Sequence, residues 1–195
     1  MSWVERKTVY FETPGKHNTE FLLELVKEYA RANGTRHIVV ASTTGETGVK
    51  ASKTFKEFNV VVVTSVYKAY EFKQENREEI LKNGARILKA IPPLRSVERA
   101  VRGRWKAYAL WLFGFEPFAL FAHALSLFGM GTKVCVEIAL MAADAGLIPV
   151  DMEVVAIAGT GRGADTALLM KPATASHFFE LEVKEVIAKP RNLRL

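Results

Sequence analysis

Residues 37–48 read HIVVASTTGETG, and residues 60–64, a short distance further on, read VVVVT. The runs HIVVA and VVVVT are apolar on both faces and rich in β-branched residues, which is typical of strands in the middle of a parallel sheet covered by helices on both sides. Residues 49–58, which lie between the runs, alternate Lys with apolar residues and predict a helix. The stretch therefore predicts a strand, a crossover helix and a second, parallel strand.

Further elements are predicted on both sides of this unit. Before it, residues 8–11 predict a short strand, followed by a helix that Asn18 can cap and Gly34 can end. After it, we expect helices at 75–82, 94–102 and 133–145 and strands at 85–90, 154–158, 167–170 and 181–188. A β-α-β-α-β opening followed by antiparallel strands indicates the α/β class, as a three-layer α/β/α fold with a mixed, mainly parallel sheet.

The composition predicts one ordinary globular domain over residues 1–195. Of the 195 residues, 49% are hydrophobic and 25% are charged, which excludes a disordered chain and a multi-domain machine. A lone Cys135 cannot form an internal disulfide, and the first residues lack the pattern of a signal peptide, so we expect a cytoplasmic protein. The sequence contains many more Glu than Asp residues and a single Gln, which indicates a composition similar to that of thermophile proteins.

The segment at residues 107–130, AYALWLFGFEPFALFAHALSLFGM, is long enough to span a bilayer. Glu116 and Pro117 lie near its middle, however, and a central carboxylate costs about 2.5–3.5 kcal/mol on insertion scales. Two short elements that meet at Glu116 and Pro117 fit better, with Pro117 in the first turn of a helix. We expect this pair to lie in the core or to face another copy in a homo-oligomer, rather than to contact a membrane.

The net charge of +6 comes from one basic stretch, residues 84–106. Within it, Arg95, Arg99 and Arg102 share a helix face and could follow the phosphates of a nucleic acid. A solvated or ligand-facing surface is the preferred interpretation, because no aromatic platform or known nucleic-acid module accompanies these residues.

The loop STTGETG, residues 42–48, joins a buried strand to the start of a helix. Backbone N–H groups can converge there, and the helix N-terminus adds partial positive charge, so the loop predicts an anion site. The glycines are not followed by the Gly-Lys-Ser/Thr of a Walker loop. Alternatively, the Ser and Thr residues of this loop only cap the helix. Thr64 and Ser65 end the neighbouring strand at the same edge of the sheet, which favours the binding of an anion.

A second loop, GTGRGADT at residues 159–166, alternates glycine with Thr and Arg between two predicted strands. Glycine allows close backbone approach, and Arg162 can meet a phosphate or carboxylate with a forked pair of hydrogen bonds. The strand-like ALLM that follows excludes a Rossmann loop. A mobile hairpin turn without a ligand remains the alternative.

Other candidate residues carry less weight. Cys135 lies in an apolar helix and is interpreted as a buried thiol rather than a nucleophile. Glu137, on the same helix, is a candidate for a buried carboxylate, with a hydrogen-bonded structural role preferred. The four histidines, His17, His37, His123 and His177, show no metal-ligand spacing, and no metal is predicted.

Four stretches carry a resemblance to a known family: YFETPGKHNTE (10–20), HIVVASTTGETG (37–48), FGMGTKVCVEIALMAADAGLIP (128–149) and GTGRGADTALLMKPA (159–173). The sequence resembles the C-terminal α/β domain of pyruvate kinase and, more closely, a family of stand-alone archaeal proteins built on that domain. The resemblance implies a phosphate site at the hydroxyl-rich loop and FMN as a cofactor. The catalytic residues of pyruvate kinase belong to a separate barrel domain, so the resemblance does not imply kinase activity.

The predicted function is therefore the binding of a phosphorylated small molecule, with FMN as the leading candidate and Tyr67 or Tyr70 packed against its ring. The alternatives are a flavin-dependent enzyme of unknown substrate, or a nucleic-acid or membrane-surface protein acting through residues 94–130. The predicted binding residues are Ser42, Thr43, Thr44, Gly45, Thr47, Gly48, Thr64, Ser65, Gly161, Arg162, Gly163, Asp165 and Thr166.

Overall fold

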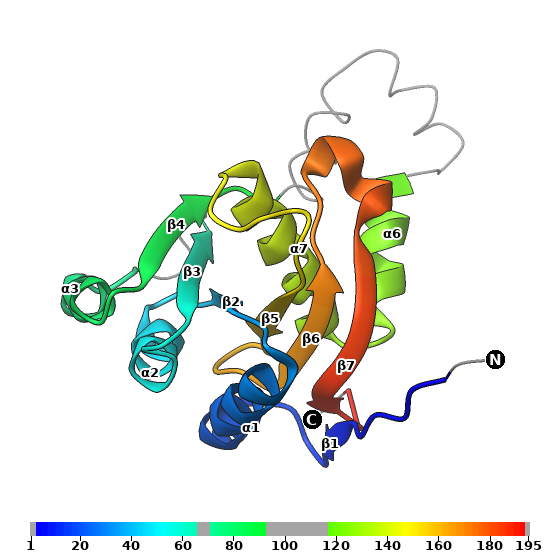
Figure 1. The fold of residues 1–195 in the computed structure, drawn as a ribbon, viewed down its shortest axis with the longest axis horizontal. Helices are drawn as coiled ribbons and strands as arrows, with labels where there is room; N and C mark the ends of the chain where they lie inside the picture. Colours follow the sequence, from blue (N-terminus) through cyan, green and yellow to red (C-terminus); the bar gives the residue numbers. More distant parts are fainter. Residues whose placement is uncertain (1–2, 66–70, 93–116, 194–195) are drawn as a thin grey trace.

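A computed structural model describes residues 3–65, 71–92 and 117–193 of the chain. Their strands form one seven-stranded sheet in the order β1-β7-β6-β5-β2-β3-β4 (Figure 1). The strands are β1 (Val9–Phe11), β2 (His37–Ala41), β3 (Asn59–Ser65), β4 (Arg86–Ala90), β5 (Val154–Ala158), β6 (Thr166–Lys171) and β7 (Glu182–Pro190).

The sheet is mixed and mainly parallel, as the sequence predicts. β2 pairs in parallel with β3 on one side and with β5 on the other, β4 extends this run beyond β3, and β1 is parallel to β7. Among the described strands, β6 alone runs in the opposite direction, between β5 and β7. From β2, the chain continues through β3 to β4 at one side of the sheet, whereas from β5 it continues through β6 to β7 at the other side. The connections therefore diverge between the carboxyl ends of β2 and β5, which is the usual place for a ligand in such sheets.

Helices cover both faces of the sheet and complete three layers. α1 (Thr19–Asn33), α2 (Glu46–Thr54) and α3 (Gln74–Lys82) pack on one face, and α7 (Met130–Asp144) packs on the other (Figure 1). In β2, Ile38 and Val40 join the core beneath α1 to α3, whereas Val39 joins the core beneath α7. Because successive strand residues point to opposite faces, a strand covered on both sides must be apolar throughout, as HIVVA is.

The segment predicted to break at Pro117 is described from that residue onward. α6 (Pro117–Ser126) begins at Pro117 and contacts α7. Phe121 of α6 meets Phe178 of the 3₁₀ helix η2 (Ala175–Glu180) edge to face, with ring centroids 5.0 Å apart. No helix in the described ranges is long and apolar enough to cross a membrane. Contact of this segment with another copy of the chain stays a prediction.

Most other predicted boundaries agree with the structure to within one or two residues. Gly34 ends α1 in the left-handed conformation, with φ +69°, as predicted. Asn18 precedes α1 but does not cap it through its side chain, whose amide donates instead to the Thr13 carbonyl. α2 begins at Glu46, three residues earlier than predicted, so the second half of the loop at 42–48 is already helical.

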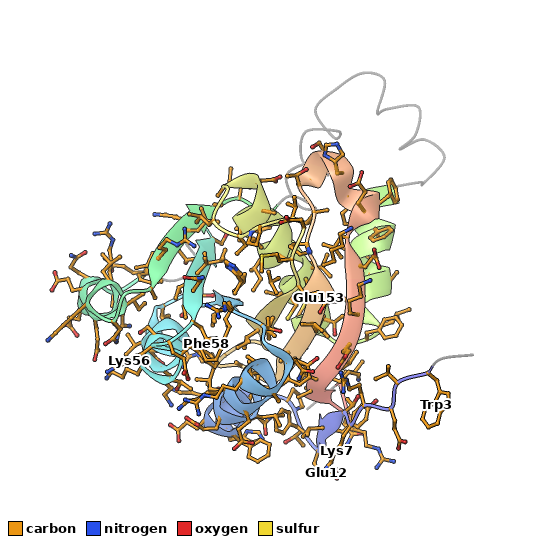
Figure 2. The ribbon with its side chains drawn as sticks, in the orientation of Figure 1. Trp3, Lys7, Glu12, Lys56, Phe58 and Glu153 are labelled. Atoms are coloured by element: carbon orange, nitrogen blue, oxygen red, sulfur yellow. The ribbon has the colours of Figure 1, made fainter. Side chains whose placement is uncertain are left out.

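The described side chains fill the space between the sheet and the helices, and Trp3 projects from the N-terminal segment away from the sheet (Figure 2). The basic helix predicted at residues 94–102, with Arg95, Arg99 and Arg102, lies outside the described residues. Tyr67 and Tyr70 also lie outside them.

Candidate anion site at the carboxyl ends of β2 and β5

A pocket of about 430 Å³ lies at the point where the connections from β2 and β5 diverge. Ala41, the last residue of β2, and Gly159, which follows β5, both line it. The starts of α1, α2 and α7 reach the same pocket, so the positive ends of three helix dipoles are directed toward it. The lining residues are Lys16, Thr19, Ala41, Ser42, Thr43, Thr44, Glu46, Thr47, Lys50, Lys73, Met130, Val134, Gly159, Gly161, Arg162 and Gly163.

The loop at residues 42–45 is held in place mainly through its carbonyl groups. The Thr43 carbonyl accepts a hydrogen bond of 3.5 Å from the Thr64 hydroxyl. The Thr44 carbonyl accepts bonds of 3.2 Å from the Lys73 N–H and 2.9 Å from the Asn76 side-chain amide. Ser42 anchors both ends, since its N–H donates to Val63 and its hydroxyl accepts from the Gly48 N–H.

The first turn of α2 leaves hydrogen-bonding groups available to a ligand. Within the described part of the chain, the backbone N–H groups of Glu46 and Thr47 have no acceptor, as expected for the first residues of a helix. The Thr47 hydroxyl also has no partner among the described residues, although Thr47 is only 8% exposed and lines the pocket. Because this hydroxyl is open to the pocket, an anion there can accept a hydrogen bond from it.

Four cationic side chains and one carboxylate line the pocket. Lys16 lies 3.0 Å from Glu46, and Lys50 lies 2.7 Å from Glu20, a residue that does not line the pocket. Lys73 and Arg162 form no ion pair with any described residue. The Lys16 ammonium holds the pKa of Glu46 below its usual range, and Lys73 and Arg162 act on this pKa in the same direction.

The glycine-rich loop contributes less to the pocket than the sequence predicts. Gly161, Arg162 and Gly163 line it, but the completely buried Asp165 and Thr166 do not. One Asp165 oxygen accepts from the N–H groups of Gly15 and Thr160, both at 3.0 Å, and the other accepts from the Thr166 hydroxyl at 2.8 Å. The Asp165 carboxylate is therefore occupied by hydrogen bonds within the protein, and the predicted approach of Asp165 and Thr166 to a ligand does not fit this geometry.

Two glycines of the loop at 42–48 also have a packing role. A Cβ on Gly45, where φ is +94°, would lie 2.6 Å from the Cβ of Asn76 on α3. A Cβ on Gly48 would lie 2.7 Å from Val62 and 2.8 Å from Ile80. Neither glycine lines the pocket, so both are required for the close approach of α2 to its neighbours rather than for room around a phosphate.

Of the two residues predicted at the end of β3, Thr64 is buried and supports the loop through the bond to Thr43. Ser65 is partly buried and, like Thr64, does not line the pocket. The end of β3 therefore positions the candidate site without forming its wall.

Sequence reasoning missed a third segment, residues 15–19, which is bound to the glycine-rich loop. The Thr19 hydroxyl accepts from the Ala164 N–H at 2.9 Å, and Gly15 donates to Asp165. A Cβ on Gly163 would lie 2.5 Å from the Cα of Lys16, so the two backbones nearly touch. The segment follows β1, a parallel strand, and the rule that indicated residues 42–48 could have indicated it too.

Lys50, Lys73, Met130 and Val134 were also missed. Lys50 lies four residues after Glu46 on α2, so the helical period places it on the same face. Met130 and Val134 lie in the first turns of α7 and contribute apolar side chains to the pocket lining. No sequence pattern indicates that Lys73 lines the pocket, because its position depends on how α3 packs against the loop at residues 42–45.

Cys135 and Glu137 lie on α7 and do not line the pocket. Cys135 is completely buried, as predicted, and its thiol donates to the Ala156 carbonyl at 3.3 Å. Burial raises the pKa of this thiol well above its ordinary value, and the Asp165 charge adds to the increase. Glu137 is also buried, and it lies 3.4 Å from Lys133, one turn earlier on the helix.

The sequence model of the pyruvate kinase alpha/beta domain matches residues 20–171. This range includes all the described residues that line the pocket except Lys16 and Thr19. The chain belongs to the pyruvate kinase alpha/beta domain family. The arrangement of helices around a mixed, mainly parallel sheet is thus the fold of that family.

Several solved structures are similar to this member of the pyruvate kinase alpha/beta domain family. A pyruvate kinase from Cryptosporidium parvum is 14% identical over 79% of this chain and 22% of its own, with a TM-score of 0.39. The pyruvate kinase of that organism in complex with ADP is 14% identical over 88% of this chain and 23% of its own, with a TM-score of 0.36. An O-ureido-L-serine synthase is 20% identical over 38% of this chain and 24% of its own, with a TM-score of 0.30. This chain spans less than a quarter of the length of each.

Proposed function

We propose that the pocket binds a phosphorylated small molecule, with its phosphate at the first turn of α2. The observation that supports this most strongly is the Thr47 hydroxyl, which faces the pocket beside the N–H groups of Glu46 and Thr47, all three without a partner among the described residues. A phosphate has enough acceptor oxygens to satisfy all three groups, and the helix dipole favours its charge. Lys73 and Arg162, which also line the pocket, supply neutralising charge.

FMN is the ligand we propose first. Its phosphate fits the groups at α2, and its ring needs an apolar surface, for which Ala41, Met130 and Val134 are available. A volume of about 430 Å³ is within the usual range of small-molecule pockets. The family resemblance of the sequence implies the same ligand. When bound, FMN supplies a ring that can exchange electrons, while the residues described here bind and orient it.

A titration of the purified protein with FMN and with riboflavin tests the proposal, because the two ligands differ only in the phosphate. We expect the protein to quench FMN fluorescence at much lower concentration than riboflavin fluorescence. Thr47→Val should weaken FMN binding by about 1–3 kcal/mol, the range for a lost hydrogen bond to a charged group, and should leave riboflavin binding unchanged.

Thr35→Val is the matched control for Thr47→Val. Thr35 is as buried as Thr47, at 7% exposed, but it lies between α1 and β2, at the amino ends of the strands, and does not line the pocket. Equal affinity for FMN and riboflavin, or equal effects of the two substitutions on FMN binding, would remove the phosphate site at α2.

A further inference from the structure

Glu46 is a carboxylate in the lining of a site that otherwise attracts anions. It lies in the first turn of α2, next to Thr47, and about half of its side chain is exposed. It is ion-paired with Lys16 at 3.0 Å and lies close enough to Lys73 and Arg162 for their charges to stabilise its ionised form. Glu46 therefore occupies the positive field that a ligand would use.

The charges around the pocket nearly match those of one phosphomonoester. Four cations line the pocket, but Glu46 neutralises Lys16 and Glu20 neutralises Lys50. Among the described residues this leaves the charges of Lys73 and Arg162, about two in total. A phosphomonoester carries about −1.5 to −2 at pH 7, so one such group balances the site.

We infer that Glu46 is a specificity-determining residue that restricts the pocket to ligands with a single phosphomonoester and an otherwise uncharged body. This inference rests on the proposed function and specifies its class of ligand. A second phosphate would bring two further negative charges, which no remaining cation among the described lining residues balances, and Glu46 would repel it directly. Glu46 thus provides the unfavourable contact that discriminates against multiply phosphorylated compounds.

The test compares glucose 6-phosphate with glucose 1,6-bisphosphate, two probes that differ by one phosphate, in competition with FMN and in direct calorimetry. For the unaltered protein, we expect the bisphosphate to bind no more tightly than the monophosphate. Glu46→Gln keeps an oxygen that can accept from Lys16 but removes the charge. It should improve the affinity for the bisphosphate about tenfold relative to the monophosphate, by an amount that decreases as salt is raised.

Glu57→Gln is the matched control for Glu46→Gln. Glu57 is also a half-exposed carboxylate, at 50% against 49% for Glu46, and it is ion-paired with Arg31 away from the pocket. The substitution changes the net charge by the same amount and should leave the ratio of the two affinities unchanged. Thermal melting of both variants checks that each is folded.

The outcomes separate this inference from the proposed function. If the unaltered protein prefers the bisphosphate, or if Glu46→Gln and Glu57→Gln change the ratio equally, Glu46 has no selective role, while a phosphate site at α2 still stands. If neither sugar phosphate nor FMN binds to the unaltered protein or to Glu46→Gln, the proposed function is wrong and the role of Glu46 is overturned with it.

Discussion

The loop at residues 42–48 and the loop at residues 159–166 have similar sequences, rich in glycine and hydroxyl groups, but they differ in where their polar groups are directed. In the first loop, the carbonyls are bound by β3 and α3, while the Thr47 hydroxyl and the neighbouring N–H groups are left for the pocket. In the second, Asp165 binds Gly15, Thr160 and Thr166, and only Arg162 remains as a charged group facing the pocket.

The difference shows that the residue types in a loop do not by themselves identify a binding site. A polar group is available to a ligand only if the folded chain has not already satisfied it. A substitution of Thr47 in the first loop should therefore weaken ligand binding and leave stability nearly unchanged. A substitution of Asp165 in the second loop should cause a large loss of stability.

The largest expected effect is that of Asp165→Ala. It removes three hydrogen bonds from a completely buried carboxylate and leaves the N–H groups of Gly15 and Thr160 without their acceptor. These N–H groups are partly buried, and the loss of their acceptor adds to the loss of the bonds themselves, so we expect the free energy of unfolding to fall by about 3 kcal/mol or more. Denaturant unfolding measures this loss.

Asp144→Ala is the control for Asp165→Ala, because Asp144 accepts a single bond, from the Ala175 N–H, at an exposed position. It should cost about 1 kcal/mol or less. If Asp165→Ala cost no more than Asp144→Ala, and weakened only the binding of FMN, the contrast between the two loops would be reversed.

The next largest effect is expected for Gly45→Ala. Its Cβ would lie 2.6 Å from Asn76, and φ there is +94°, so the change should lower the free energy of unfolding by about 2–3 kcal/mol. Gly34→Ala separates the two causes, since φ is +69° at Gly34 but a Cβ there meets nothing within 4 Å. Thermal melting should show the larger loss for Gly45→Ala, and equal losses would mean that α2 and α3 do not pack as described.

The smallest effect on stability is expected for Arg162→Ala. Arg162 is exposed and has no ion-pair partner in the described part of the chain, so the melting temperature should hardly change. FMN affinity should fall by about 1–3 kcal/mol if the guanidinium binds the phosphate. Arg77→Ala, at an exposed position of α3 outside the pocket, should change neither quantity. An unchanged FMN affinity in Arg162→Ala would leave the second loop with no role in binding.

The fold was predictable because its main signals are local and agree with one another. The runs HIVVA and VVVVT are buried on both faces, and Gly34 ends α1, as their sequences indicate. The antiparallel strand β6 follows directly from the short loop after β5, because a connection this short cannot return the chain in parallel.

The site was predictable only in part, because it also depends on contacts between distant segments. The loop at 42–48 follows a recognisable strand, but Lys73 reaches the pocket through the packing of α3, and Lys16 through a backbone contact with Gly163. The burial of Asp165 depends on Gly15, 150 residues away along the chain. Local sequence carries no information on such contacts, so it could not distinguish a carboxylate that binds a ligand from one that binds the backbone.

The most direct test of the contrast between the two loops is the change in backbone amide resonances when the ¹⁵N-labelled protein is titrated with FMN. We predict that the largest shifts occur at Glu46 and Thr47, whose N–H groups have no acceptor in the described ranges, while Gly15 and Thr160, which donate to Asp165, shift little. Large shifts at Gly15 and Thr160 with unchanged Glu46 and Thr47 would contradict the account.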